Sequence, residues 1–278
     1  MDGDDTMAGA LAGAMQSRHY GKYRGRVESN VDPVNRARLQ VKVPALLGEQ
    51  PVWAMPCVPY AGAGVGLFAL PPVGAGIWVE FEGGDLDYPI WSGCFWGPGE
   101  MSITPALPEI KFFKTNGITL TLSEIDPTRG FTIEVAPPLA PQPLTLKMNA
   151  DGIKISNGTQ IIVNMTQQVI ELSNSNQTAV KLEAQSLALN TGQASVATLA
   201  ADTVEVKQGT ATLKLSASGI ELTHNPAAVK VAASGIEVNS NPAKISVAPA
   251  TIELSNGAGN IKVSPASVNV NNGALEVI

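Results

Sequence analysis

The sequence has little of several residue types on which chemical function commonly depends. Its 278 residues include only two cysteines and two histidines, and charged residues make up 15% of the chain. Cys57 and Cys94 lack Cys-x-x-Cys or Cys/His spacing, so we expect small buried apolar residues, with a disulfide left open. A net charge of −6 argues against general attraction to nucleic acid or anionic membranes. We therefore expect no cofactor and no resident metal.

A long uncharged stretch, Pro51 to Val79, has the length of a membrane span. Five glycines and five prolines interrupt it, so a continuous helix is excluded and strands with tight turns are predicted. The acidic start, Met1 to Asp5, differs from the basic start of an export signal, so none is expected.

Aromatic residues are almost absent from the second half. All tryptophans and tyrosines lie before residue 114, and Phe131 is the one phenylalanine beyond it. The architecture should change there, and the stretch 98–115 carries three prolines typical of a linker, with one strand at its end. The predicted organisation is a flexible segment over 1–17, a compact aromatic-cored domain over 18–97, a linker over 98–115 and a repetitive module over 116–278.

The module over 116–278 contains a sequence repeat of sixteen residues, as "TLKLSASGIELTHNPA" and "AVKVAASGIEVNSNPA" show. Each copy holds two apolar-polar-apolar triplets separated by Gly, Asn, Pro or Ser. Alternation predicts a short strand for each triplet, with its first and third side chains on one face. The predicted core positions are Leu213, Leu215, Ile220, Leu222, Val229, Val231, Ile236, Val238, Ile245, Val247, Ile252, Leu254, Ile261, Val263, Val268 and Val270.

Such short strands cannot bury enough surface alone, so they must stack into a solenoid. Two architectures fit: a single-chain β-helix, or three identical chains around one axis. An eight-residue unit suits one face of a triangle, and three chains leave no lateral edge, which favours the homotrimer. The middle positions alternate in charge, as in Lys214, Glu221, Lys230 and Glu237, and predict exposed cross-strand pairing.

The first domain contains several strand-like segments rich in aromatic and β-branched residues. They are "YGKYRGRVESN", "RARLQVKVP", "PVWAMPCVPY", "VGLFALPP", "GIWVEFEGGD" and "YPIWSGCFWG". A small closed barrel of the oligonucleotide/oligosaccharide-binding (OB) type would enclose them.

Ordered motif elements in this domain carry a specific resemblance. They include Asp32-Pro33, Val41-Lys42-Val43-Pro44, Trp53-Ala54, the glycine run to Gly66 and Gly83-Gly84-Asp85. Over about 75 residues the chain resembles the N-terminal barrel of the central spike family of contractile phage-tail baseplates, which includes baseplate assembly protein V and the spikes of type VI secretion and extracellular contractile injection systems. One departure is Ala75, where the family commonly has an acidic residue.

The resemblance implies an all-β protein: an OB-fold collar followed by an intertwined trimeric, three-stranded β-helix needle. It implies a virion or injection-particle component, made in the bacterial cytoplasm, that pierces the target cell envelope. A baseplate hub protein would lie above the collar, where residues 1–17 would order against it. The basic stretch 18–42 is expected to be a docking surface for neighbouring baseplate proteins. The main alternative is a trimeric barrel-plus-solenoid adhesin or glycan-binding tail fibre.

Some family members carry an inserted lysozyme domain between barrel and needle, so the resemblance also raises the alternative of a hydrolase. The acidic residues Glu80, Glu82, Asp85 and Asp87 share one strand and its turn, which predicts a solvated barrel edge rather than a two-carboxylate cleft. Residues 98–143 are too few for an enzyme domain, so we expect no enzyme. The later barrel strands are acidic, so we expect no nucleic acid partner.

The C-terminus lacks the His-x-His tip that holds iron in some family members. The two histidines, His19 and His224, lie elsewhere, and His224 is expected in an exposed turn. The apolar end instead suggests a platform for a separate tip protein of the PAAR-repeat kind, with docking residues Leu275, Val277 and Ile278.

Overall fold

A computed structural model of the chain describes residues 13, 18–103, 105–174, 178–192 and 194–277. It divides into two compact units, 1–106 and 107–278. The predicted segment 1–17 lies outside the described residues, apart from Gly13. No described helix is both long and apolar enough to cross a membrane.

The first unit contains a closed barrel with the strand order β1-β2-β3-β7-β6. Neighbouring strands are antiparallel, except that β3 and β7 are parallel. This arrangement fits the predicted OB-type enclosure. The elements of the unit are β1 (Tyr23–Ser29), β2 (Leu39–Lys42), α2 (Pro44–Leu47), β3 (Val52–Pro56), β4 (Ala61–Gly62), β5 (Val65–Gly66), β6 (Gly76–Phe81), the 3-10 turn Glu82–Gly84 and β7 (Pro89–Phe95).

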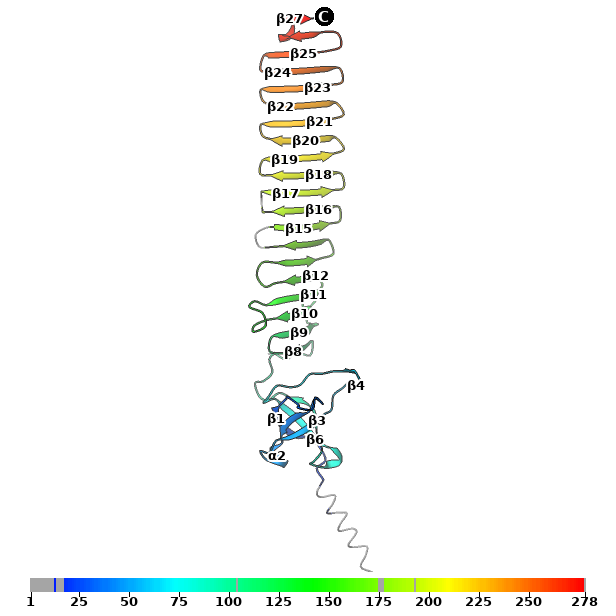
Figure 1. Cartoon of the computed structure of the whole chain (residues 1–278), viewed down its shortest axis with the longest axis vertical. Helices are drawn as coiled ribbons and strands as arrows, with labels where there is room; N and C mark the ends of the chain where they lie inside the picture. The colour runs from blue at the N-terminus through cyan, green and yellow to red at the C-terminus, as the bar shows by residue number, and fades with distance from the viewer. Residues whose placement is uncertain (1–12, 14–17, 104, 175–177, 193, 278) are drawn as a thin grey trace, which may run out of the picture. The chain divides into compact units, whose positions relative to one another are not determined.

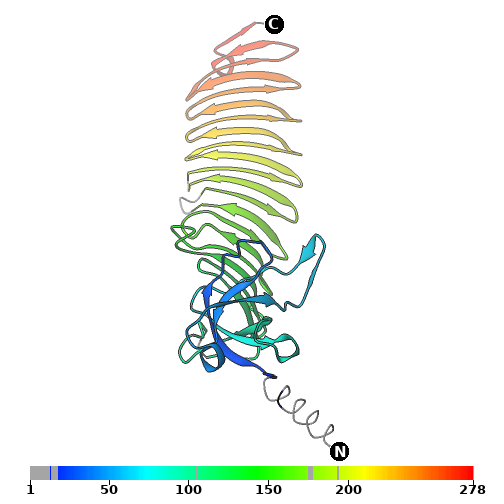
Figure 2. The same ribbon diagram turned by 60° about the horizontal axis from the view of Figure 1, so that its bottom comes forward.

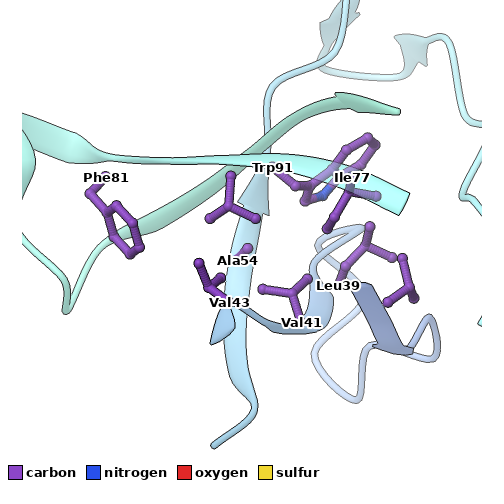
Figure 3. Close-up of a cluster of buried hydrophobic side chains, with 9 residues drawn as sticks. Leu39, Val41, Val43, Ala54, Ile77, Phe81 and Trp91 are labelled. Carbon is purple, nitrogen blue, oxygen red and sulfur yellow. The ribbon is translucent and has the colours of Figure 1, made fainter. Parts of the chain in front are cut away.

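The barrel is held together by a core of side chains from alternate positions of its strands (Figure 3). Leu39 and Val41 of β2, Ile77 and Val79 of β6, and Val27 of β1 are almost fully buried. Alternation places successive residues on opposite faces of a strand, and closing the sheet turns one of those faces inward. The remaining buried members of the core are Val43, Ala54, Phe81 and Trp91.

Two predictions for the barrel need correction. The stretch "VGLFALPP" is not a barrel strand, because only Val65–Gly66 is extended and it pairs with β4 in a separate hairpin. Cys57 and Cys94 are not buried, since both are free and exposed. A short apolar run without charges does not distinguish a barrel strand from an apolar hairpin.

The second unit is a ladder in which each strand pairs antiparallel with the next, from β8 to β27 (Figures 1 and 2). Its strands confirm the predicted all-β class. The strands are β8 (Ile110–Lys114), β9 (Ile118–Ser123), β10 (Gly130–Val135), β11 (Leu144–Asn149), β12 (Gly152–Ser156), β13 (Ile162–Met165), β14 (Val169–Ser173), β15 (Thr178–Glu183), β16 (Ser186–Thr191), β17 (Ser195–Ala200), β18 (Thr203–Gln208), β19 (Ala211–Ser216), β20 (Gly219–His224), β21 (Ala227–Ala232), β22 (Gly235–Ser240), β23 (Ala243–Ala248), β24 (Thr251–Asn256), β25 (Gly259–Val263), β26 (Val268–Val270) and β27 (Leu275–Val277), with a 3-10 turn at Asn271–Gly273.

The ladder begins earlier than the predicted boundary at residue 116. Strand β8 lies within the stretch 98–115, as the strand expected at the end of the linker, and pairs with β9. The chain between the two units is therefore shorter than the predicted linker, because hydrogen bonding to β9 draws residues 110–114 into the sheet.

Candidate trimer interface

The predicted core positions of the repeat form two continuous columns on one face of the ladder. In the first column, Leu213 lies opposite Leu222, Leu222 opposite Val229 and Val229 opposite Val238. The same pairing continues through Ile245, Leu254, Ile261 and Val270. The second column runs through Leu215, Ile220, Val231, Ile236, Val247, Ile252, Val263 and Val268.

The apolar face extends far upstream of the counted repeat. Phe113 lies opposite Leu120, Leu120 opposite Ile133 and Ile133 opposite Leu146, so the first column starts at β8. It then passes through Ile155, Val163, Leu172, Val180, Leu189, Ala197 and Val206 to Leu213. Sequence reasoning did not assign these residues to the core over 113–146. The apolar-polar alternation in "ITLTLS" and "FTIEV" could have indicated these core positions. Because the connections between these strands differ in length, however, the sequence does not show which residues lie opposite one another.

This face is not covered by the chain itself. Ile220 is 46% exposed and Ile252 is 50% exposed, although both lie mid-column. A single-layered sheet is stable when its apolar face packs against another layer of protein. A continuous apolar face exposed to water along the whole ladder is unfavourable. Covering each half-exposed Leu, Ile or Val contributes on the order of 1 kcal/mol. The face therefore has the properties of an intersubunit core.

The opposite face is polar and carries charges of alternating sign. Lys214 lies opposite Glu221, Glu221 opposite Lys230, and Lys230 opposite Glu237. Lys244 forms an ion pair with Glu237 at 3.2 Å from a diagonal position. The exposed cross-strand pairing predicted from the repeat is thus present as a column in register. Opposite charges across neighbouring strands favour this register over one that brings like charges together.

A third column lies at one margin of the apolar face. His224 pairs with Ala211 and Ala227, and Ala227 pairs in turn with Ser240. Since His224 alternates with Ile220 and Leu222 along β20, it points to the apolar side. It ends a strand, so the expectation of a turn histidine is corrected. Among the described residues, no group of three or more His, Cys, Asp or Glu side chains could hold a metal ion.

At the end of the ladder, β27 pairs with β26 and places Leu275 opposite Val270. Leu275 is 59% exposed. Val277 lies in the same short strand, opposite Val268. Ile278, the remaining predicted docking residue, lies outside the described residues.

Two members of the acidic cluster of the barrel, Glu80 and Asp85, form ion pairs. Glu80 contacts the Lys22 ammonium and accepts a hydrogen bond from the Ser92 hydroxyl at 3.2 Å. Hydrogen bonding from Lys22 lowers the pKa of Glu80 below its usual value. Asp85 pairs with Arg18 at 2.8 Å. A general acid needs a raised pKa, so this environment does not prepare Glu80 for that role.

Four basic residues of the stretch 18–42 form ion pairs within the barrel. Besides Arg18 and Lys22, Arg38 pairs with Asp32 at 2.9 Å and Lys42 with Glu28 at 3.3 Å. The guanidinium of Arg24 instead stacks over the rings of Trp78 and Phe95, at 5.2 and 4.9 Å. Arg24, Arg26 and Arg36 are not in these ion pairs, so part of the positive charge of the stretch stays uncompensated.

Comparison with protein families agrees with both parts of this geometry. Residues 23–96 match the type VI secretion system/phage-baseplate injector OB domain, which spans the barrel. Residues 233–276 match the phage baseplate V C-terminal trimerisation domain, which spans the last strands of the ladder. No curated protein sequence matches the chain. The OB domain and the trimerisation domain, both of the phage-baseplate kind, support a homotrimeric protein of the baseplate spike family, a component of a virion or injection particle.

Proposed function

We propose that this protein is the membrane-piercing needle of its particle and transmits the force of sheath contraction to the target envelope. The observation that carries the proposal is the apolar face, which keeps one register from β8 to β27 and is left half exposed by a single chain. Three such faces turned inward would form a closed prism without lateral edges.

Such a prism is suited to axial load. Strands spaced by about 4.8 Å would give a ladder of this length roughly 90 Å along its stacking direction. Each rung is tied to the next by backbone hydrogen bonds, and the cores of three faces interlock, so bending would strain both at once. Little chemistry is required, because the energy comes from the contracting sheath.

The two ends define the proposed partners. At the collar, residues 1–17 and the remaining basic surface of the barrel would dock a hub protein. At the other end, the apolar side chain of Leu275, together with Val277 and Ile278, would seat a separate tip protein of the PAAR-repeat kind. We propose no enzymatic activity and no nucleic acid partner, which the ion pairing of Glu80, Asp85 and part of the basic stretch supports.

The experiment that tests this function is complementation of particles that lack their spike. The full chain, first confirmed as a trimer by light scattering, should restore particles that penetrate and kill target cells on contraction. The matched variants are Ile236→Asp on the apolar face and Glu237→Ala on the outer face, and only the first should abolish penetration. Strong binding of the resting trimer to envelope glycans, without need for contraction, would favour the adhesin alternative instead.

A further inference from the structure

An uncharged arm projects from the barrel between β3 and β6 (Figures 1 and 2). We define this arm as residues 59–69, and every one of them is exposed. Its four large apolar side chains are more than half exposed: Tyr60 at 59%, Val65 at 54%, Leu67 at 55% and Phe68 at 76%. This concentration of apolar surface in a segment without any charge is typical of a contact site.

The arm is held in place rather than loosely attached. The Leu67 amide donates to the Tyr60 carbonyl at 2.8 Å, which closes the hairpin of β4 and β5. At its base, the Cys57 amide donates to the Trp91 carbonyl at 2.9 Å. On the return side, Leu70 packs against the barrel core and Pro71 is buried. A preformed arm loses little conformational entropy on binding.

A matching groove lies on the barrel beside the base of the arm. It has a volume of about 450 Å³ and is lined by Pro71, Pro72, Cys94, Phe95 and Trp96. Its floor is rigid, because the Phe95 ring packs against Trp78 with centroids 5.0 Å apart. Trp96 is 62% exposed, so the groove has an open aromatic wall. Glu100, its one charged lining residue, accepts a hydrogen bond from the Gly97 amide at 2.5 Å.

We infer that the arm of each subunit packs into this groove on the next subunit of the trimer. Both surfaces are largely apolar, so each can cover the other. Glu100 is the one charged residue of the groove lining, and the Gly97 amide already donates a hydrogen bond to it. The groove lies at the end of β7, where the chain leaves the barrel for the ladder, so trimerisation of the ladder holds three barrels at high local concentration. A head-to-tail contact repeated around a three-fold axis forms a closed ring, so every arm occupies a groove and every groove is filled.

The consequence is a collar with its own intersubunit lock. The contact uses a different surface from the apolar face of the ladder. It would therefore hold the three barrels together at the end of the trimer where a hub would bind. The inference rests on the homotrimer but not on the piercing role.

The test is disulfide trapping in the full-length chain. With Cys57 replaced by Ser, native Cys94 in the groove is the one native thiol left for a cysteine introduced as Ala63→Cys at the arm tip. A bond between two introduced cysteines would link two subunits only, whereas arm-to-groove bonds can link all three. Mild oxidation should then yield covalent dimers and trimers on a non-reducing gel, and thiol should reverse them. Partial desolvation by the groove raises the pKa of the otherwise exposed Cys94 thiol, so oxidation is run at mildly alkaline pH.

The control moves the second cysteine away from the groove. It combines Ala63→Cys with Cys94→Ala and Asp87→Cys, since Asp87 is exposed and lies beyond the opposite end of β6 from Gly76. Both pairs are tethered in the same trimer, but only the test pair would be in contact. It should therefore give on the order of tenfold more covalent trimer than the control.

Each contrary result has a distinct meaning. Equal cross-linking in test and control, or only intrachain bonds in a chain that light scattering shows to be trimeric, overturns the arm contact while leaving the spike function standing. Cross-linking of Ala63→Cys to a cysteine-bearing hub but not between subunits also overturns it. A monomeric chain overturns both. As a second readout, Phe68→Asp should raise acrylamide quenching of tryptophan, whereas Val31→Asp, at an equally exposed position, should not.

Discussion

Asp32 shows how one buried carboxylate organises a barrel loop. Its side chain, 3% exposed, accepts hydrogen bonds from the amides of Val34, Arg36 and Arg38. The Arg38 guanidinium bonds both carboxylate oxygens and stacks over the Trp53 ring at 5.1 Å. The hydrogen bond from Arg38 is the largest of several effects that hold the pKa of Asp32 well below its usual range. The charge is thus fully compensated, which explains how it can be buried.

Replacing this carboxylate should destabilise the barrel in a pH-dependent way. Asp32→Asn leaves Arg38 unpaired, so we expect the thermal unfolding midpoint at pH 7 to fall by several degrees. The folded pKa is depressed, so the contribution of Asp32 is complete above the unfolded pKa of about 3.9 and is lost as pH falls through the lower folded value. The gap between wild type and variant should therefore narrow at about pH 3. Tryptophan fluorescence during thermal unfolding measures it.

Asp87→Asn provides the control for this experiment, because Asp87 is an exposed aspartate of the same barrel. It should leave the midpoint unchanged at both pH values. A gap for Asp32→Asn that stayed constant down to pH 3 would contradict the assignment of a lowered pKa.

Gly235 illustrates a second single-residue constraint, this time in the ladder. It begins β22 with φ 137°, and a Cβ there would overlap the carbonyl oxygen of Val247. Gly235→Ala should lower the free energy of unfolding by roughly 1–3 kcal/mol per subunit, because the strand must shift to relieve the contact. Gly257→Ala is the matched control, since its φ is 59° but no atom lies near its would-be Cβ. Equal melting temperatures for the two variants would show that the close approach to Val247 is not limiting.

At the scale of elements, the ladder works because each strand of the repeat places two apolar residues on one face and a polar or charged residue between them on the other. Neighbouring strands repeat this arrangement in register, so the sheet has two chemically distinct faces throughout. A slip by one residue would reverse the faces of a strand. The charge alternation adds little stability by itself, but it penalises registers that oppose like charges.

Substitutions at adjacent residues of one strand test this division. Ile236→Asp places a carboxylate on the apolar face and should cost at least roughly 2 kcal/mol per subunit, because the charge has no partner there. We expect loss of the trimer, measured by light scattering and by resistance to detergent. Glu237→Ala, one residue along on the outer face, should keep the trimer. A stable trimer of the Ile236→Asp variant would exclude this face as the intersubunit core.

At the scale of the whole molecule, the length of the ladder should be adjustable in steps of one sixteen-residue repeat. Deleting residues 227–242 joins Pro226 to Ala243, so Ile245 takes the place of Val229 and both columns continue. The variant should remain a trimer whose shaft is shorter by about 10 Å, the spacing of two strands, as measured by small-angle scattering.

A half-length deletion is the control. Removing residues 227–234 puts Gly235 in the place of Ala227, so Ile236 falls on an outward position. The face of that strand is then reversed, and we expect aggregation or loss of the trimer. If both deletions behaved alike, strand alternation would not govern assembly of the shaft.

Much of this protein follows from its sequence alone. The sixteen-residue repeat and its alternation determined the short strands of the second unit, their apolar face and the two columns from Leu213 to Val270. The reason is that side-chain direction along a strand is a local property with a period of two. The aromatic segments and turn glycines likewise determined the barrel, and the motif elements around Asp32 and Gly83 indicated its family.

Other features were decided only by the tertiary structure, because they depend on which distant segments pair. Strand β8 joins the ladder through hydrogen bonds to β9, and connections of uneven length still bring Phe113 and Ile133 into the column of Leu213. The stretch around Phe68 is an apolar run that reads as a strand, yet it folds onto itself as an arm, and Cys57 and Cys94 are left exposed. Sequence pattern fixes the direction of a side chain, whereas long-range pairing decides what, if anything, covers it.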